Sequence, residues 1–409
     1  MNNGLVAIVL GGTVPHIELI RQLKSRGYYT VLVDFLVNPP AKEYADLHIR
    51  ESTLDVGAVY KIAVEYKADL VIATCIDHAN RTACAVLEML GKHFPYSTEV
   101  ARNVTDKQRM KKIMRENDIL TADYVVVKSE KDKVDLPLPL VVKPVDSNGS
   151  RGIKKIISRE QLQDAVVDAL LASKTGSAIV ERYVPGVEAA VYAYIQNGVA
   201  SLILSNERQV YEDPETGKMP GFAMIYPCQE VQKRSGKIRV VCEKLAKAFD
   251  LDNTPLLVQM KITGDQIYVI ELMPRIGGGQ SYWNIKKLTQ FDIISATIDS
   301  FLGNHVDVEA QAPSVVAATN NVYTKAGVFG EVLGGDDLLT DGTVDEFKIL
   351  RCKGDEIKED LTSGNRVCTY VVVDVNVDLV RERAMRAFKR VEVRDIDGED
   401  MKRTDIFWR

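Results

Sequence analysis

A glutamine and a glutamate near the middle of the chain have the types and spacing of a metal site. Gln259 and Glu271 lie in two consecutive apolar segments, 256–262 and 267–272, which the sequence predicts to be the strands of a hairpin. Alternate residues of a strand share a face, so a three-residue turn over 264–266 would place Gln259 opposite Glu271. An amide oxygen and a carboxylate would then converge on one point. Mg²⁺ binds through one or two such oxygens together with substrate phosphates, so the pair predicts a magnesium site.

An arginine follows this pair at a short distance along the chain. Arg275 lies four residues beyond Glu271 and just before a run of three glycines. Its guanidinium is placed to neutralise charge that develops on a phosphorylated group. A glutamate in an apolar strand needs a partner. The competing interpretation is therefore a structural ion pair of Glu271 with Arg275 or with Lys261.

A lysine followed by small polar residues and glycines forms a second candidate site. Lys143 stands at the end of the apolar segment 138–142, and Gly149 and Gly152 follow in the next loop. Glycine lets backbone N–H groups approach phosphate oxygens, and the lysine supplies a cation. The loop is not of the Walker A type, because G-x-x-x-x-G-K-[ST] does not occur. A flexible hairpin is the alternative.

Two glutamates seven residues apart form a third candidate site. Glu181 and Glu188 flank the turn Pro185-Gly186 beside apolar residues. Backbone groups at a strand end can pair with the edge of an adenine, and a carboxylate can accept two ribose hydroxyls. Salt bridges at the protein surface are the alternative interpretation.

A glycine pair near the N-terminus suggests a dinucleotide site only weakly. Gly11-Gly12 follow the first apolar strand, and Asp34 ends the second. The sequence GGTVPH lacks the G-x-G-x-x-G pattern, so one of the three glycine roles of that motif can be met. An α/β domain whose loop contacts a substrate is the interpretation we favour over NAD binding.

The elements that must position these residues change along the chain. Apolar strands at 6–10, 30–33 and 70–73 alternate with helices such as 56–65, which predicts a parallel sheet. From about residue 95 the pattern favours α+β structure with antiparallel hairpins.

Two local features of this second part carry definite predictions. Thr105 and Gln108 predict a capping box ahead of a helix that holds Lys107 in its first turn. Ser158 and Gln161 predict the start of another helix. The polar stretch 206–221 is expected to be an exposed loop.

Composition excludes several classes of protein. The chain has 409 residues, of which 46% are hydrophobic and 27% charged, so it is long enough for two to four domains and is not disordered. A net charge of −5 argues against general nucleic-acid binding. Apolar runs fall far short of the ~20 residues that span a bilayer. The six cysteines are scattered and the N-terminus does not resemble a signal peptide, so a cytoplasmic location is expected.

Taken together, in this order and spacing, the segments resemble the ATP-grasp superfamily. It includes biotin carboxylase, carbamoyl phosphate synthetase, D-alanine–D-alanine ligase and the L-amino acid ligases. The resemblance covers nearly the whole chain and implies an α/β and α+β fold in three parts. These are a Rossmann-like pre-ATP-grasp domain over 1–95, an ATP-grasp domain over 96–305 with a mobile lid at about 121–185, and a C-terminal α+β cap over 306–409.

The superfamily pattern implies a role for each matching residue. Lys107 and Lys143 would bind the ATP phosphates, and Lys143 would act in catalysis together with Arg275. The glycine-rich lid, the adenine hinge and the ribose ligand would be formed by Ser147, Gly149, Ser150, Gly152, Glu181, Arg182, Tyr183, Val184 and Glu188. Within the hinge, backbone atoms of Arg182 and Val184 would contact the adenine edge.

The same pattern implies the metal and substrate residues. Gln259 and Glu271 would be metal ligands, and Arg275 would stabilise an acyl phosphate. The acceptor substrate would face Gly277, Gly278 and Gly279. The asparagine of the E-x-N-P-R motif is replaced by Met273, whose thioether Mg²⁺ does not favour.

The resemblance implies an ATP-dependent carboxylate–amine ligase of the C–N bond-forming class (EC 6.3). Its cofactors would be ATP and Mg²⁺ or Mn²⁺, and its substrates a small carboxylate and an amine, with no nucleic acid or membrane partner. A homodimer is compatible with the superfamily. Two alternatives stay open: an enzyme that phosphorylates bicarbonate, and a non-catalytic ATP-binding protein with a degenerate site.

Overall fold

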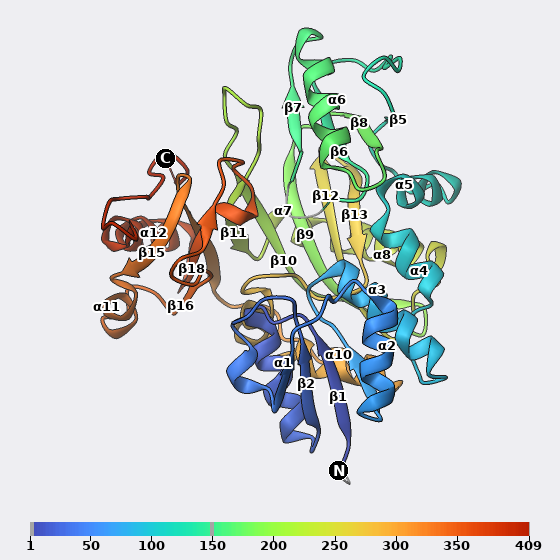
Figure 1. Ribbon diagram of the computed structural model, residues 1–409. Coiled ribbons are helices and arrows are strands. Elements are labelled where there is room, and N and C mark those ends of the chain that lie inside the picture. The colour runs from blue at the N-terminus through green and yellow to red at the C-terminus, as the bar shows by residue number, and fades with distance from the viewer. Residues whose placement is uncertain (1–3, 148–150, 409) are drawn as a thin grey trace.

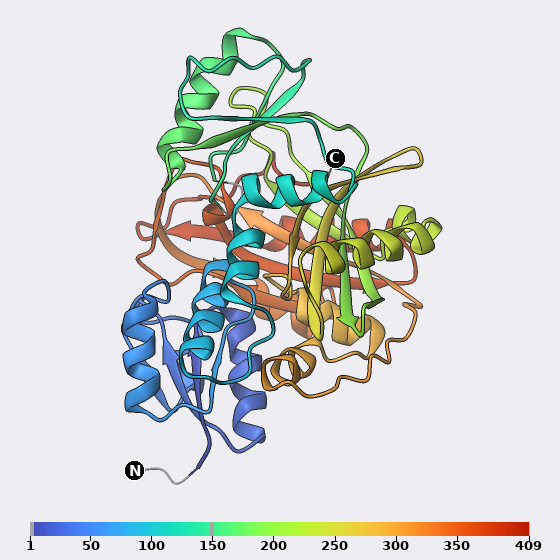
Figure 2. The same ribbon diagram turned by 90° about the vertical axis from the view of Figure 1, so that its right-hand side faces the viewer.

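The N-terminal part of the chain forms a parallel sheet. The computed structural model describes residues 4–147 and 151–408, and Figures 1 and 2 show their arrangement. The strands of this first sheet are β1 (Val6–Leu10), β2 (Tyr29–Val33), β3 (Leu47–Ile49) and β4 (Leu70–Ile72). Its connections contain α1 (Val14–Ser25), the 3-10 turn η1 (Lys42–Tyr44), α2 (Val56–Glu65) and α3 (Asp77–Met89). All five residues of β1 are buried, as expected for a strand inside a parallel sheet.

The order of these strands, β3-β2-β1-β4, reverses direction between β1 and β4. The reversal brings the loops after these two strands together. A contact between them shows this: Thr13 Oγ1 lies 3.5 Å from Cys75 Sγ. Sheets of this kind bind ligands beyond the carboxyl ends of their strands at such a reversal. This edge therefore faces the region in which a substrate is expected.

Two helices lead from this sheet to the middle of the chain, namely α4 (Thr98–Thr105) and α5 (Lys107–Glu116). The capping box predicted for Thr105 and Gln108 is wrong. Thr105 ends α4, and α5 is capped by Asp106, whose carboxylate accepts the N–H groups of Gln108 and Arg109 at 2.9 and 3.0 Å. A carboxylate there also compensates the positive end of the helix. Lys107 lies in the first turn, as predicted.

A four-stranded antiparallel sheet projects at the top of Figure 1. Its strands, in spatial order, are β5 (Tyr124–Val127), β8 (Ala178–Arg182), β6 (Leu140–Pro144) and β7 (Lys154–Ile156). Helix α6 (Glu160–Ala172) packs on it through Ala165 and Val166. The helix begins after Arg159, not at a Ser158 cap. The Gln161 side chain nevertheless accepts the N–H group of Ser158, which is one of the two bonds of a capping box.

An eight-stranded antiparallel sheet forms the centre of the molecule. Its strands, in spatial order, are β13 (Gln266–Met273), β12 (Thr254–Thr263), β9 (Val187–Gln196), β10 (Val199–Val210), β11 (Gly221–Tyr226), β14 (Val316–Tyr323), β18 (Arg366–Asp374) and β16 (Glu346–Ile349). Side chains such as Val191 and Val258 cover one face with α8 (Ser235–Ala248). The opposite face of β9, β10, β12 and β13 carries the charged side chains of Glu188, Arg208, Lys261 and Glu271.

The expected loop over 206–221 is a loop only in part. Strand β10 continues to Val210, and Asn206 is buried and donates to the Tyr192 hydroxyl at 3.0 Å. Arg208, near the end of β10, contacts Glu188 of the candidate site, so a polar sequence here does not indicate exposure.

The remaining elements surround the central sheet. Three short helices are α7 (Gln229–Lys233), α9 (Ser281–Thr289) and α10 (Ile293–Leu302). The last hundred or so residues contribute β14, β18 and β16 to the central sheet. They also form a small sheet, whose strands in spatial order are β17 (Glu356–Ile357), β15 (Gly327–Leu333) and β19 (Glu392–Asp395). The helical elements of this part are α11 (Gly335–Thr340), η2 (Ser363–Asn365) and α12 (Val377–Arg390). Among the described residues, no helix has the length and apolar character needed to span a bilayer.

Candidate active site

The hairpin of β12 and β13 brings Gln259 and Glu271 together, although not by the turn that the sequence suggested. The strands pair as far as Thr263 and Gln266, so the turn has two residues rather than three. A β-bulge between Gln259 and Met260 restores the register, and Gln259 pairs with Glu271. A bulge adds one residue to one strand and re-aims the side chains beyond it. The predicted pairing is therefore confirmed, whereas the predicted turn is wrong.

The pair offers one carboxylate and one amide oxygen to a cation. Within the described residues, no group of three or more His, Cys, Asp and Glu side chains is arranged to hold a metal ion. Met273 is buried in the same apolar cluster as Leu257 and Tyr192, and its sulfur lies 3.1 Å from Arg275 Nη2. Two protein oxygens fit Mg²⁺ only when the phosphates of a nucleotide complete its ligands.

Arg275 is held by a carboxylate from the parallel sheet. Its Nε and Nη2 atoms donate to the two carboxylate oxygens of Asp77 at 2.6 and 2.7 Å, and Nη1 donates to the carbonyl of Ile276 at 2.7 Å. Burial alone would raise the pKa of Asp77, but the guanidinium lowers it. Asp77 begins α3 at the carboxyl edge of the parallel sheet, so the ion pair joins that edge to the end of β13.

Lys143 and Glu181 form a buried ion pair, and a second buried lysine, Lys111, lies beside the same carboxylate. Lys143 Nζ lies 2.9 Å from Glu181 Oε1, and Lys111 Nζ lies 3.3 Å from the same oxygen. Burial would raise the pKa of Glu181, and the two ammonium groups lower it. The carboxylate is consequently ionised, with two cations beside it.

Glu188 also lies between two cations. Its Oε1 atom accepts from Arg208 Nη1 at 2.5 Å, and its Oε2 atom lies 3.1 Å from Lys261 Nζ, which β12 places opposite it. Burial opposes ionisation of Glu188, but the two cations outweigh it and lower the pKa to about 2. This carboxylate points from β9 to the same face as Gln259.

The predicted phosphate loop is tied to the start of α5. Lys107 Nζ donates to the carbonyl of Ser147 at 2.6 Å, and the Lys107 backbone N–H donates to the carbonyl of Val145. Gly149 and Ser150 lie outside the described residues. Gly152 has a positive φ of 68°, and a Cβ there would lie 2.8 Å from Pro144 Cγ, so glycine is required at this position.

The hinge residues run along the end of β8. The backbone N–H groups of Arg182 and Tyr183 already donate to the carbonyls of Asp123 and Pro139, each at 2.9 Å. The Arg182 side chain extends toward Asp123, 3.5 Å away. Val184 is buried. The carbonyl of Arg182 is therefore the polar group with which this residue can meet a purine edge.

The glycine run continues from Arg275 to α9. The Gly277 carbonyl accepts from Ser281 Oγ at 2.6 Å, and Gly278 and Gly279 are exposed.

Glu271 is close enough to raise the pKa of two nearby arginines. Burial has the largest effect on the pKa of Arg208 and of Arg275 and lowers it, but the nearest carboxylates outweigh burial, and Glu271 raises both values further.

In a dinucleotide site, Asp34 would bind a ribose. Here its carboxylate forms hydrogen bonds within the N-terminal part of the chain instead. Its carboxylate accepts the N–H groups of Gly12 at 2.7 Å and of Leu36 at 2.9 Å. A Cβ at Gly12 would lie 2.4 Å from Pro39 Cβ. The glycine pair thus serves the close packing of two loops.

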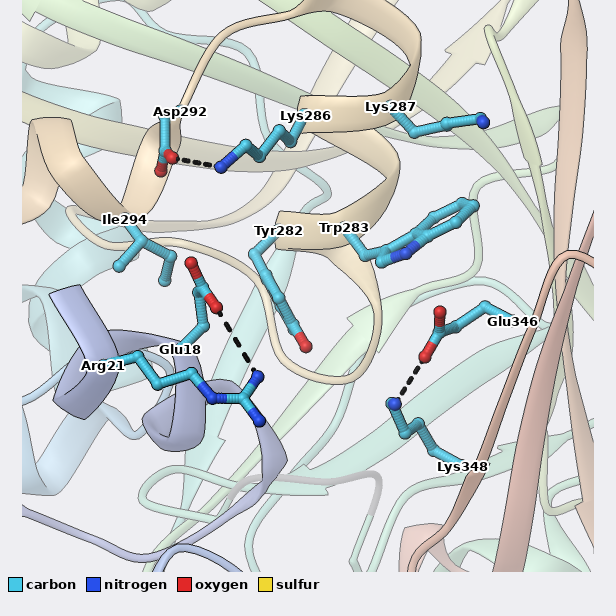
Figure 3. A pocket seen from close by; sticks show the side chains of 10 residues that line it. All are labelled: Glu18, Arg21, Tyr282, Trp283, Lys286, Lys287, Asp292, Ile294, Glu346 and Lys348. Carbon is cyan, nitrogen blue, oxygen red and sulfur yellow. Dashed lines mark hydrogen bonds and ion pairs between the residues drawn. The ribbon is translucent and has the colours of Figure 1, made fainter. Parts of the chain in front are cut away.

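A cavity of about 440 Å³ lies between α1, α9 and β16, as Figure 3 shows. Three acid–base pairs line it, namely Glu18–Arg21, Asp292–Lys286 and Glu346–Lys348. Lys287 also lines the cavity, so four basic side chains stand against three acidic ones, and the wall offers a single surplus cation to the several charges of a polyphosphate.

Three charged residues of the candidate site escape identification from the sequence, namely Asp77, Lys111 and Arg208. Asp77 follows a buried parallel strand, and a polar residue at that position is a recognisable signal. Lys111 stands among other basic residues of α5, and nothing in the sequence marks it. Arg208 belongs to the stretch that was expected to be a loop.

Comparison with known proteins points to one family. Residues 136–282 match the family model of the ATP-grasp domain. The formate-dependent phosphoribosylglycinamide formyltransferase of Proteus mirabilis (strain HI4320) is 26% identical over 190 residues, which are 45% of this chain and 47% of that protein. A D-alanine–D-alanine ligase of Nitrosococcus oceani is 33% identical over 135 residues, 32% of this chain and 42% of that protein. The chain thus matches less than half the length of each of these two relatives.

Solved structures extend the similarity of fold to nearly the whole chain. The L-amino acid ligase from Bacillus licheniformis superposes with a TM-score of 0.78 at 16% sequence identity, covering 97% of this chain and all of that one. At this level of identity, the likeness concerns the fold.

Proposed function

We propose that this chain, whose residues 136–282 match the ATP-grasp domain, is an ATP-dependent carboxylate–amine ligase. ATP transfers its terminal phosphoryl group to a carboxylate, which gives an acyl phosphate and ADP. An amine then attacks the acyl carbon, loses a proton and expels phosphate. The observation that carries this proposal is the group of charged side chains on one face of the central sheet, where Glu188 contacts Arg208 and Lys261 and where Glu271 acts on Arg208 and Arg275.

In this proposal the nucleotide lies between the projecting sheet and the central sheet. The hinge 181–184 contacts the adenine, Glu188 accepts the ribose hydroxyls, and Lys107 and Lys143 bind the phosphates. Ser147 and Gly152 border the phosphates. The tie between Lys107 and Ser147 supports this arrangement, because it couples a phosphate-binding lysine to the base of the loop.

Phosphoryl transfer needs alignment and neutralisation of charge more than covalent help from the protein. Mg²⁺ or Mn²⁺, when bound by Gln259, Glu271 and the nucleotide phosphates, supplies charge that polarises the transferred group. Arg275 would stabilise the acyl phosphate, and Asp77 would orient the guanidinium. Gly277, Gly278 and Gly279 would border the acceptor substrate. Closure of the loop would exclude water, which otherwise hydrolyses an acyl phosphate.

The proposal extends to organisation and surroundings. We assign three parts, 1–95, 96–305 with a lid at about 121–185, and 306–409, and we propose a homodimer that works in the cytoplasm on small molecules. All six cysteines are free, which suits a reducing compartment. Light scattering of the purified protein tests the dimer.

The decisive experiment is a panel of carboxylates with hydroxylamine as a general amine. A ligase releases ADP and forms a hydroxamate only with its own acid. ADP release stimulated by bicarbonate alone would favour a carboxylase instead. ATP binding without turnover under any acid would refute the ligase proposal in favour of a degenerate site.

A further inference from the structure

A buried lysine that no motif marks lies behind the Lys143–Glu181 pair. The Lys111 side chain is only 1% exposed, and its Nζ lies 3.3 Å from Glu181 Oε1. Nζ also donates to Thr121 Oγ1 at 2.6 Å, and that hydroxyl donates to the backbone carbonyl of Val269 at 2.8 Å. Val269 belongs to β13, the strand of Glu271. A chain of contacts therefore runs from β13 through Lys111 to Glu181 on β8.

The three buried charges do not cancel. Two ammonium groups face one carboxylate oxygen, and that oxygen accepts no hydrogen bond of good geometry. The cluster keeps one surplus positive charge in a place from which water is excluded. The pKa of Lys111 is lowered to about 8, because burial lowers it most, Glu181 opposes burial, and Lys143 adds to the lowering. An anion placed beside the cluster would relieve this surplus.

The two lysines differ in their freedom to meet such an anion. Lys143 is the last residue but one of β6, the strand that leads into the phosphate loop. Lys111 is fixed on α5 by Thr121 and is covered on all sides. When Lys143 turns toward a phosphate, Glu181 loses its nearer cation. A buried carboxylate without a cation is costly, so the release of Lys143 needs a second cation that stays.

We propose that Lys111 is a positioning residue for nucleotide binding, the permanent counter-cation of Glu181 that releases Lys143 to the phosphates of ATP. This inference rests on the function proposed above, in that ATP is the nucleotide. Lys111 itself does not touch the ligand. Without it, Glu181 would hold Lys143 as its single partner, and ATP would have to compete with that carboxylate.

The first test measures ATP binding by calorimetry in three variants. Lys111→Met should raise the Kd for ATP about tenfold or more, which corresponds to about 1.4 kcal/mol. Lys111→Arg keeps the charge and should bind ATP within about threefold of the wild type. Lys112→Met is the matched control on the same helix, because its side chain is 71% exposed and contacts Glu116 at 3.8 Å. It should leave the Kd unchanged.

A double variant separates positioning from a merely structural role. In Lys111→Met/Glu181→Gln the carboxylate that traps Lys143 is absent, so the double variant should bind ATP more tightly than Lys111→Met does. If Lys111 only supported the packing, the second substitution would add to the loss. Additive loss in the double variant would overturn the proposal.

The pH profile of the wild type gives a test that needs no unstable variant. Lys111 is faced by Glu181 from β8, Lys143 from β6, Arg115 from its own helix and the Tyr124 ring from β5. With a pKa of about 8, Lys111 loses its charge above that pH, and ATP affinity should fall as in Lys111→Met. Lys111→Arg should not show this fall, since arginine stays charged.

The outcomes distinguish a failure of the Lys111 proposal from a failure of the ligase proposal. Parallel pH profiles of the wild type and Lys111→Arg would contradict the inference, as would unchanged affinity in Lys111→Met. If the wild type itself does not bind ATP, the ligase proposal fails and this inference fails with it. If the wild type binds ATP but Lys111 has no effect, only the inference fails.

Discussion

Glu188 provides a quantitative test of the ribose assignment, by means of the isosteric change Glu188→Gln. Each of its two carboxylate oxygens has one cation beside it, Arg208 on one side and Lys261 on the other. Each oxygen keeps a lone pair for one hydroxyl of a ribose. A hydrogen bond to a charged group contributes about 1.5–3 kcal/mol, and the cations that share the charge favour the lower end. Two such bonds then amount to about 3 kcal/mol, or roughly 100-fold in Kd.

The assay compares the binding of ATP and of 2′,3′-dideoxy-ATP by calorimetry in the presence of Mg²⁺. The wild type should prefer ATP by roughly 100-fold, and Glu188→Gln should reduce this preference to below about tenfold. Glu116→Gln, whose side chain is 59% exposed, is the control and should keep the wild-type preference. Equal affinity of the wild type for both nucleotides would refute the assignment, as would an undiminished preference in Glu188→Gln.

The pH dependence of this preference follows from the pKa of Glu188, which is lowered to about 2. A carboxylate with a lowered pKa contributes stability that is present above its unfolded-state pKa and is lost as the pH falls through its folded-state pKa. The ion pairs of Glu188 should therefore be intact at neutral pH and weaken only below about pH 4. We expect the ratio of the two affinities to stay constant between about pH 5 and about pH 9.

Four further predictions follow from the site and its scaffold. Glu271→Ala should abolish metal-dependent turnover, and electron paramagnetic resonance should detect tight Mn²⁺ binding to the wild type only when ATP is present; tight binding without nucleotide would contradict the two-oxygen site. Arg275→Ala should bind ATP as the wild type does but lower the single-turnover rate by about 10²–10³, and loss of ATP binding alone would refute its catalytic role. Lys143→Ala should raise the Kd for ATP about tenfold, whereas an unchanged Kd would remove it from the phosphate site. Gly186→Ala should lower the melting temperature measured by calorimetry, because φ is 110° and a Cβ would lie 2.2 Å from the carbonyl oxygen of Ile262; an unchanged melting temperature would show that the turn can relax.

Much of the scaffold can be predicted from the sequence because it depends on local patterns. The five apolar residues of β1 and the hairpin of β12 and β13 are visible as periodic apolar segments, and the structure confirms them. The pairing of Gln259 with Glu271 was predicted from a turn of the wrong length. A bulge supplied the missing residue, and bulges leave no clear signal in a single sequence.

The amino-acid sequence by itself determined which residues could do chemistry, because lysine and glutamate at the ends of apolar strands must face either a partner or a ligand. The tertiary structure alone decided which partner each of them meets. Asp77 and Arg275 are 198 positions apart, and Lys111 and Glu181 belong to different layers of the fold. The partner of a buried charge is the opposite charge that tertiary packing places beside it. That packing depends on contacts between distant segments, which local periodicity does not encode.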